Sequence, residues 1–330
     1  MIRRAFLPFF LAVLFFSAAG NVHAQIPTAG DISISVSPTN PGPLEDVTIS
    51  IQSYSVNIPA ADIEWSVDGK SEVGGIGQSN HTITTKNIGS PTTVRVTITG
   101  VGSVPVTRSI VITPMAVDIL WQAIDSVVPP LYRGKALPTS ESQVKFVAIP
   151  QIKSQNGTLL SSQNFLYSWS EKYTVQQSRS GYGKDSFTTN MDYLNPIKHI
   201  GIDVSVRDGS IATKSSLDLS PVQPKILWYA SSPLYGPQFD RALGDSYIVS
   251  GSETSIVAEP YFFSPADPSD KAISYVWSLN GQPLSTPAIP NALFLHRESK
   301  ATGKATLDLS VTNLARLFQE GKAHLNLSLQ

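Results

Sequence analysis

Apolar and polar residues alternate along much of the chain. The pattern is clear in VTISI (47–51), VKFVAI (144–149) and ATLDLSV (305–311), where hydrophobic side chains occupy every second position. A period of two is that of a β-strand with one buried face, and Gly, Pro, Asn and Asp bound these segments. Several such strands within about 100 residues predict an antiparallel sandwich of two sheets. The fold class is therefore expected to be all-β.

Tryptophans mark a repeat in the chain. The phrases IEWSVDG, YSWSEKY and YVWSLNG contain Trp65, Trp169 and Trp277, and both intervals are close to about 105 residues. A second pair, DILW ending at Trp121 and KILW ending at Trp228, is separated by nearly the same interval. These spacings indicate one module repeated three times.

The connections between modules repeat as well. Pro114 and Pro221 stand at equal distances before Trp121 and Trp228, which puts boundaries near residues 115 and 222. Short connectors that contain proline are stiff. The sequence thus predicts a semi-rigid rod of three sandwich modules, at residues 25–115, 116–222 and 223–330.

Turn residues follow the repeated tryptophan in the first and third modules: Asp68, Gly69, Asn280 and Gly281. Asp-Gly and Asn-Gly tolerate positive φ and close tight hairpins. Each tryptophan thus stands on a strand just before a turn, where an indole fills the space between two sheets. We expect the tryptophans of all three modules to be core residues rather than ligand platforms.

Two phrases are shared by the second and third modules. One is YSW (167–169) and YVW (275–277), and the other is IDVSVRDG (202–209) and LDLSVTN (307–313). They resemble the Tyr-x-Trp and the closing Val-x-Leu-x-Val-x-Asn/Asp phrases of the polycystic kidney disease (PKD) domains. The acidic, glycine-rich phrase after that family's tryptophan is absent. The resemblance implies immunoglobulin-like sandwiches of PKD type in exported, surface-associated proteins that space, scaffold or adhere, and it carries no catalytic residues.

The N-terminus has the form of an export signal. Basic residues precede an apolar run at residues 5–19, and Val22 and Ala24 stand at the −3 and −1 positions of a cleavage site. A signal peptide at residues 1–24 is expected, with a mature chain that begins at Gln25 and is secreted or held at the cell surface. An uncleaved N-terminal anchor is the alternative. No later stretch is apolar enough to cross a bilayer.

Composition narrows the function classes. The 24 basic and 25 acidic residues nearly cancel, and no long run of like charge occurs, so a nucleic-acid groove is not expected. Cysteine is absent, which excludes disulfides and lipidation on cysteine. Each module must then be stabilised by its own core.

No catalytic or metal-binding set can be assembled from the sequence. The five histidines lack the spacing of zinc ligands. Ser142 and Lys145 match only the Ser-x-x-Lys fragment of penicillin-binding enzymes, at the start of a strand and without that class's partner motifs. Asp267 and Asp270 share a loop, but two acids supply few of the oxygens that calcium needs. We expect no cofactor and no metal, with weak calcium binding as the alternative.

Aromatic residues in loops are the remaining candidates for binding. Tyr132 and Tyr235 stand in two PLY phrases within proline-rich loops, and Phe262 and Phe263 belong to a dense aromatic run after Pro260. One interpretation is packing between consecutive modules. The other is a docking patch for an envelope protein or a glycan.

One segment carries helical signals. In TNLARLFQEGKAHL (312–325), Thr312 or Asn313 can cap a helix and Gly321 can end it. We expect a loop between two strands that contains about one or two helical turns.

The sequence favours a non-enzymatic exported protein that acts as a scaffold or spacer. One alternative is an adhesin-like module that recognises a glycan or an envelope protein through its loop aromatics. A second alternative is a hydrolase whose site lies in the insertion of the middle module, around Glu171, Asp185 or Asp192.

Overall fold

The computed structural model describes residues 32–54, 56–100, 104–153, 157–206, 212–298 and 302–329. The predicted signal peptide and its cleavage site lie outside the described residues. By contact density the chain divides into two units, one made of residues up to 36, 48–82 and 93–111, and the other of 37–47, 83–92 and 112–330. The three-module division with boundaries near residues 115 and 222 stays a prediction.

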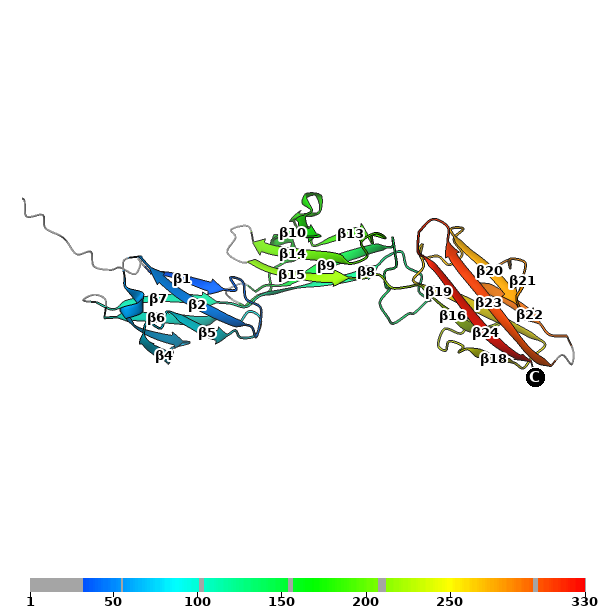
Figure 1. The fold of residues 1–330 in the computed structure, drawn as a ribbon, viewed down its shortest axis with the longest axis horizontal. Coiled ribbons are helices and arrows are strands. Elements are labelled where there is room, and N and C mark those ends of the chain that lie inside the picture. Colours follow the sequence, from blue (N-terminus) through cyan, green and yellow to red (C-terminus); the bar gives the residue numbers. More distant parts are fainter. Residues whose placement is uncertain are drawn as a thin grey trace, which may run out of the picture. The chain divides into compact units, whose positions relative to one another are not determined.

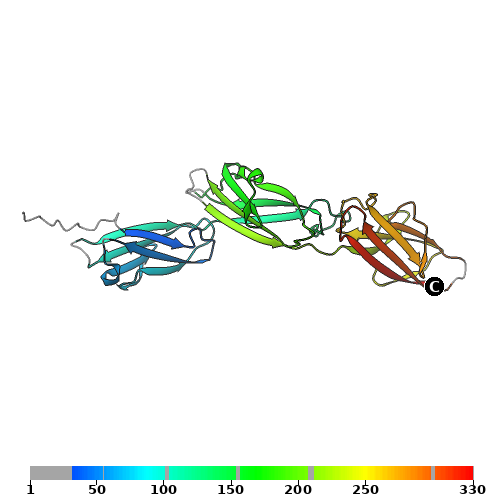
Figure 2. The ribbon, with the colours of Figure 1, turned by 45° about the horizontal axis from the view of Figure 1, so that its top comes forward.

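Strands dominate the described chain, and the all-β expectation is confirmed (Figure 1). The helical elements in this part are three short 3-10 turns: η2 (Ile58–Ala60), η3 (Ser162–Asn164) and η4 (Gln177–Arg179). Paired sheets from three successive stretches of sequence carry the remaining structure, and Figure 2 shows their layers from a second direction. These sheets are the immunoglobulin-like architecture that the PKD resemblance implies.

The first stretch forms a three-stranded and a four-stranded sheet. In sheet order, the strands are β1 (Ile32–Ser37), β2 (Asp46–Ser53) and β5 (Asn80–Thr84), then β4 (Lys70–Ile76), β3 (Asp62–Val67), β6 (Thr92–Thr99) and β7 (Val106–Ile112). Strand β3 pairs antiparallel with both β4 and β6. Its alternate residues Ile63 and Trp65 are buried, as the period of two predicts.

The second stretch is a sandwich whose two sheets enclose one core. Its strands are β13 (Ser186–Asn190), β9 (Gln143–Gln151) and β8 (Ala116–Ala123), then β11 (Thr174–Val175), β10 (Phe165–Glu171), β14 (Lys198–Val206) and β15 (Ala212–Leu219), with β12 (Gly181–Tyr182) beside β10. Val144 and Phe146 from one sheet pack with Trp169 and Ile200 from the other. We call this unit the second sandwich.

The third stretch repeats the plan and forms the third sandwich. One sheet contains β17 (Gly236–Pro237), β16 (Lys225–Ser232), β19 (Glu253–Tyr261) and β22 (Ala292–His296), and the other contains β18 (Ser246–Val249), β24 (Glu320–Leu329), β23 (Gly303–Asn313), β20 (Ile273–Leu279) and β21 (Gln282–Pro283). Strand β18 runs parallel to β24, whereas β20, β23 and β24 are antiparallel. Trp228 and Ile256 meet Trp277 and Leu309 in the core between them.

The repeated tryptophan has the same surroundings in all three stretches. Trp65, Trp169 and Trp277 are at most 1 % exposed. Each indole N–H donates to a backbone carbonyl further along the chain, at 2.8 Å to Gln78, 2.9 Å to Lys184 and 2.9 Å to Pro290. The indoles lie inside the protein, and the polar edge of each ring is satisfied there.

The turns after two of these strands use the residues that the sequence points to. Asp68 and Asn280 have φ of 50° and 51°, and the glycines that follow them, Gly69 and Gly281, are also in the left-handed region. Asp68 Oδ1 accepts a hydrogen bond from the Thr93 amide at 3.0 Å, and Asn280 Oδ1 accepts one from the Thr306 amide at 2.8 Å. The side chain thus ties each turn to the next strand of its sheet.

The expected helical turns between residues 312 and 325 do not form. Strand β23 continues to Asn313, β24 begins at Glu320, and the residues between them make bends and a turn. Phe318 has φ of 60°, which a right-handed helix does not allow. The Leu317 amide donates to the Glu141 carboxylate at 2.7 Å instead of to a helical carbonyl. A partner far away in sequence overrides the local helical signals.

Candidate functional site

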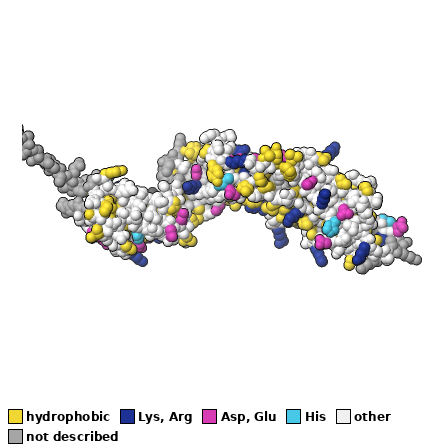
Figure 3. Space-filling model, in the orientation of Figure 1, with side chains coloured by type: hydrophobic (Ala, Val, Ile, Leu, Met, Phe, Trp, Pro, Cys, Tyr) yellow, Lys and Arg dark blue, Asp and Glu magenta, His cyan; other side chains and the backbone are white. Residues whose placement is uncertain are grey.

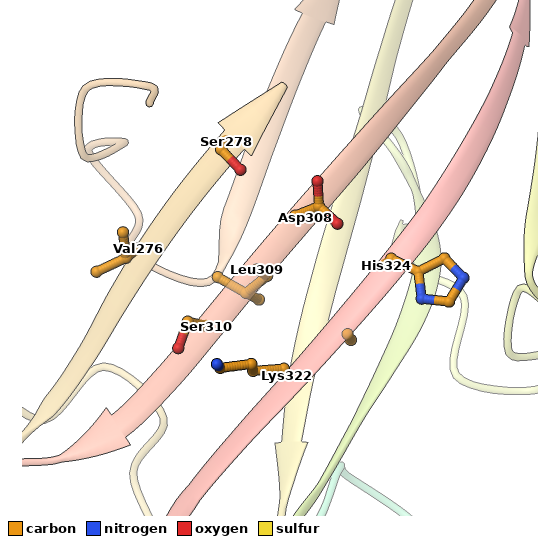
Figure 4. A pocket seen from close by; sticks show the side chains of 8 residues that line it. Val276, Ser278, Asp308, Leu309, Ser310, Lys322 and His324 are labelled. Carbon is orange, nitrogen blue, oxygen red and sulfur yellow. The ribbon is translucent and has the colours of Figure 1, made fainter. Parts of the chain in front are cut away.

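A shallow hollow lies on the solvent side of the sheet that contains β20, β23 and β24. Its volume is about 300 Å³, and Figure 4 shows its lining residues: Val276, Ser278, Asp308, Leu309, Ser310, Lys322, Ala323 and His324. The polar residues of this lining alternate along each strand with residues that belong to the core of the third sandwich. The hollow is therefore part of the polar face that a half-buried sheet turns to water.

Three side chains in this hollow form a row across neighbouring strands. Ser278 is paired with Asp308, and Asp308 is paired with His324. A nucleophilic triad needs the histidine between the serine and the acid, whereas here the aspartate lies in the middle. No hydrogen bond joins these three side chains, all of which lie in the described chain. The row does not have the arrangement of a serine hydrolase.

The second sandwich contains a partly buried ion-pair network around Glu171. Lys198 Nζ lies 2.5 Å from Glu171 Oε1, and Arg179 Nη1 lies 3.0 Å from Glu171 Oε2. Burial alone would raise the pKa of Glu171, but the hydrogen bonds and charges of Lys198 and Arg179 outweigh it and hold the pKa below its ordinary value. Glu171 is thus a fixed anion rather than an acid or base.

The other acids of the middle insertion do not complete a catalytic pair with it. Asp192 forms an ion pair with Lys172 at 3.1 Å and accepts a hydrogen bond from the Leu194 amide. The Leu194 amide and Lys172 hold the pKa of Asp192 below its ordinary value. Asp185 is not part of either ion pair. The hydrolase alternative receives no support from these contacts.

The aromatic residues proposed for binding lie in different surroundings. Tyr235 is 81 % exposed at the tip between β16 and β17, and Tyr132 is 37 % exposed, with its ring 5.7 Å from that of Tyr261. Phe262 is 6 % exposed and Phe263 is fully buried. The two phenylalanines are therefore not accessible to a ligand, which corrects their assignment as a candidate surface, and Tyr235 is the one clearly presented to solvent.

The structure also brings together an exposed aromatic pair that the sequence did not indicate. The rings of Tyr193 and Phe318 lie 6.3 Å apart at a tilt of 33°, and their side chains are 43 % and 64 % exposed. Their neighbours Leu194 and Leu317 are also exposed. These residues come from loops without periodic patterning, and only the pairing of the two loops brings them together.

The loop that carries Phe318 is bound to the segment between β8 and β9. Arg316 Nη1 donates to the Glu141 carbonyl at 2.6 Å and lies 2.8 Å from Asp125 Oδ2. The side-chain amide of Gln319 donates to the Ser140 carbonyl at 2.6 Å. Donors from the third sandwich therefore meet acceptors from the segment that belongs to the second.

Main-chain bonds and an aromatic cluster continue this contact. The Val127 amide donates to the Phe263 carbonyl at 2.7 Å, and the Phe262 amide donates to the Val127 carbonyl at 2.9 Å. Thr139 Oγ1 donates to the Phe262 carbonyl at 2.9 Å. Side chains of both sandwiches then pack as one cluster: Tyr229, Tyr261, Phe262, Val128, Leu137, Val222 and Phe239. We call the contact between residues 124–142 and the third sandwich the joint.

One acid is buried on the strand that carries this cluster. Glu259 on β19 is 4 % exposed. Burial raises the pKa of Glu259 to about 7. Burial likewise raises the pKa of Tyr261, and the phenol of Tyr229 adds to the effect through a hydrogen bond of 2.6 Å.

Charge and metal-binding groups are dispersed over the described residues. No cluster of three or more histidine, aspartate or glutamate side chains in this part could hold a metal ion. Basic and acidic side chains are interspersed on the face drawn in Figure 3. Within the described segments, no helix has the length and apolarity of a membrane span.

Comparisons with known proteins find distant structural neighbours and no relative by sequence. No family model and no curated protein matches the chain. Three N-terminal domains of the outer capsid protein Hoc from bacteriophage RB49 align over 91 % of this chain and 98 % of theirs, at 13 % identity and a TM-score of 0.25. Fibronectin(III)-like modules of CbhA from Clostridium thermocellum align over 58 % of this chain and 95 % of theirs, at 12 % identity and a TM-score of 0.28. SGBP-B of a mixed-linkage glucan utilization locus of Bacteroides ovatus was solved with a mixed-linkage heptasaccharide. It aligns over 88 % of this chain and 65 % of its own, at 9 % identity and a TM-score of 0.24.

Proposed function

We propose that this chain is an exported, non-enzymatic array of immunoglobulin-like sandwiches that acts as a scaffold or spacer. The joint is the observation that supports this proposal best. A spacer must resist bending where one module meets the next, and a stiff connection needs bonds beyond the covalent chain. Here Val127, Thr139 and Arg316 contribute such bonds between the second and third sandwiches.

The coupling of the two sandwiches can be measured by calorimetry on the full chain. We expect the second and third sandwiches to unfold in one cooperative transition. Replacing Arg316 and Gln319 together by alanine should split this transition in two, whereas Lys145→Ala, an exposed change on β9, should leave it intact. Separate unfolding of the two sandwiches in the unaltered protein would contradict a coupled spacer.

Export is part of the same proposal and has its own test. The predicted signal peptide calls for a mature protein whose N-terminal residue is Gln25, located outside the cytoplasm. Fractionation followed by N-terminal sequencing checks this. Full-length protein that stays in the cytoplasmic fraction would contradict export.

A second candidate function is binding of a glycan or an envelope protein through exposed aromatics. The Tyr193–Phe318 pair and Tyr235 favour it, because exposed rings on ordered loops supply contact area at low entropic cost. A glycan array and an envelope pull-down with the unaltered protein, Phe318→Ala and Tyr235→Ala test it, with the exposed Val276→Ala as the matched control. Binding that none of these aromatic changes reduces would rule out this role for the rings.

A further inference from the structure

Strand β19 of the third sandwich is buried on both faces. Six consecutive residues, 256–261, are buried. Ile256 and Ala258 belong to the core of the sandwich. Since side chains alternate along a strand, Glu259 and Tyr261 point to the opposite face. That face would meet water in an isolated sandwich, and here its Tyr261 packs with Val128 and Leu137 of the joint.

Glu259 is a carboxyl group without a partner under this cover. None of the described residues donates a hydrogen bond to it, although it is 4 % exposed. The neighbouring phenols of Tyr229 and Tyr261 bond to each other at 2.6 Å. A neutral carboxyl can remain there, but an ionised one needs water or a cation.

The titratable groups around Glu259 do not neutralise it. The phenols that interact electrostatically with it or with Tyr261 are Tyr132, Tyr229, Tyr261 and Tyr275. Lys225 on β16 is paired with Tyr261 and is exposed. On the covering segment, Arg133 is exposed and Lys135 lies over the ring of Trp121 at 4.0 Å. Burial is therefore the one cause of the raised pKa.

The polar half of the joint is incompletely bonded. Two buried hydroxyl oxygens, those of Ser140 and Ser264, lack a hydrogen-bond partner among the described residues. Both residues lie in or next to the joint. Opening the joint would give these atoms water, which lowers the cost of separating the two sandwiches. The aromatic cluster thus stabilises the closed joint, whereas hydration of the unpartnered hydroxyl groups stabilises the open one.

We propose that the joint is pH-sensitive: it stays closed while Glu259 is neutral and opens more often once this carboxyl ionises. This inference rests on the joint described under the proposed function and adds a regulator to it.

The direction of the pH effect follows from the pKa of Glu259 in the open and in the closed joint. In the open joint Glu259 is hydrated and has its ordinary pKa, near 4.5, whereas in the closed joint the pKa is about 7. Below the lower value both forms are neutral and opening does not depend on pH. Between the two values only the open form loses its proton, so opening increases. Above the higher value both forms are ionised and the increase ends.

Hydrogen exchange on the full chain tests the proposal. The amides of Val127 and Phe262 bond across the joint, so their protection reports its opening after correction for the pH dependence of intrinsic exchange. From about pH 5 to about pH 8 we expect the opening constant to rise roughly fifty- to hundred-fold. Glu259→Gln should remove this rise. Glu253→Gln, an exposed change on the same strand, should keep it.

The outcomes separate this inference from the spacer proposal. Amides of Val127 and Phe262 that are unprotected at every pH would contradict the joint itself. Protected amides with a flat pH profile, or a profile that Glu259→Gln leaves unchanged, would contradict only the pH sensitivity. If Glu259→Gln fails to fold, carboxyl carbon NMR of the unaltered protein decides: a Glu259 signal that titrates near pH 7 supports the proposal, and one near pH 4.5 overturns it.

Discussion

The indole nitrogen of Trp277 lies 2.9 Å from the carbonyl oxygen of Pro290 and donates a hydrogen bond to it inside the third sandwich. Trp65 and Trp169 make the same kind of bond in their own sandwiches. The ring therefore fills the space between two sheets and also satisfies a backbone carbonyl there. Loss of the ring removes apolar contact and leaves that carbonyl unpaired.

Truncation of this ring should be costly. We expect Trp277→Ala to lower the free energy of unfolding of the third sandwich by about 3–5 kcal/mol, measured by urea denaturation. Trp277→Phe should cost less, because a ring remains, although the bond to Pro290 and part of the apolar contact are lost. Trp121→Ala is the control, since this indole is partly exposed. An equal loss for Trp121→Ala and Trp277→Ala would contradict the special role of the repeated position.

The turn after Trp277 gives a second, smaller effect. Alanine at position 280 must adopt a φ near 51° and loses the bond to the Thr306 amide. We expect Asn280→Ala to lower the free energy of unfolding of the third sandwich by about 2 kcal/mol, measured by thermal denaturation. Asn280→Gly tolerates the backbone and loses only the bond, so it should cost about 1 kcal/mol. A glycine variant as unstable as the alanine variant would show that φ is not the cause.

The sequence predicted these features because they are local. Alternation along a strand and an Asn-Gly after a tryptophan can be read within one module, and the repeated interval can be read by comparing modules. The matching turn of the second sandwich was missed, because Lys172 and Tyr173 adopt positive φ without glycine or asparagine. Only the surrounding sheet can hold such residues in the left-handed region.

The polar contacts of the joint could not be predicted from the sequence. Thr139 and Phe262 are separated by 123 positions, and Arg316 and Glu141 by 175. Polar loop residues carry no periodic signal that would pair them over such distances. The same contacts explain why the helical signals at residues 312–325 were misleading. The sequence singled out Phe262 and Phe263 as part of an unusual aromatic run. In the structure Phe262 packs in the cluster of the joint, and Phe263 packs in the core of the third sandwich.

The buried ion pair of the second sandwich should be sensitive to removal of one partner. Lys198 is 3 % exposed in its side chain, and Lys198→Met leaves Glu171 with the charge of Arg179 and the 3.5 Å hydrogen bond from Thr189 Oγ1. We expect a loss of about 3 kcal/mol. Arg179→Met should cost less because Arg179 is more exposed. Lys198→Met combined with Glu171→Leu should recover most of the loss, and no recovery would contradict an unpaired charge as the cause.

Acid should weaken the same network. The folded pKa of Glu171 is below its ordinary value of 4.5, so its contribution is present above about pH 4.5 and is lost as the pH falls through the folded pKa. Urea denaturation between about pH 3 and pH 6 should show this decline in the unaltered protein. Glu171→Gln should flatten the part that belongs to this residue. An unchanged slope in the variant would assign the decline to other carboxyl groups.

Gln319 connects the polar half of the joint to the third sandwich. Its side-chain oxygen accepts bonds from the Ser264 amide at 3.0 Å and from Asn313 Nδ2 at 2.9 Å, and its nitrogen donates to the Ser140 carbonyl. The side chain is buried, so Gln319→Ala leaves several polar groups without partners.

We expect Gln319→Ala to cost about 2–3 kcal/mol in the unfolding of the third sandwich and to increase exchange at the Val127 amide. Gln319→Glu separates the two roles of this side chain, because it keeps the acceptor and replaces the donor with a second oxygen that faces the Ser140 carbonyl. It should preserve the bonds to Ser264 and Asn313 yet weaken the contact with the covering segment. Exchange at Val127 should therefore rise in both variants, and a Gln319→Glu protein with unchanged exchange there would show that the Ser140 bond does not hold the joint.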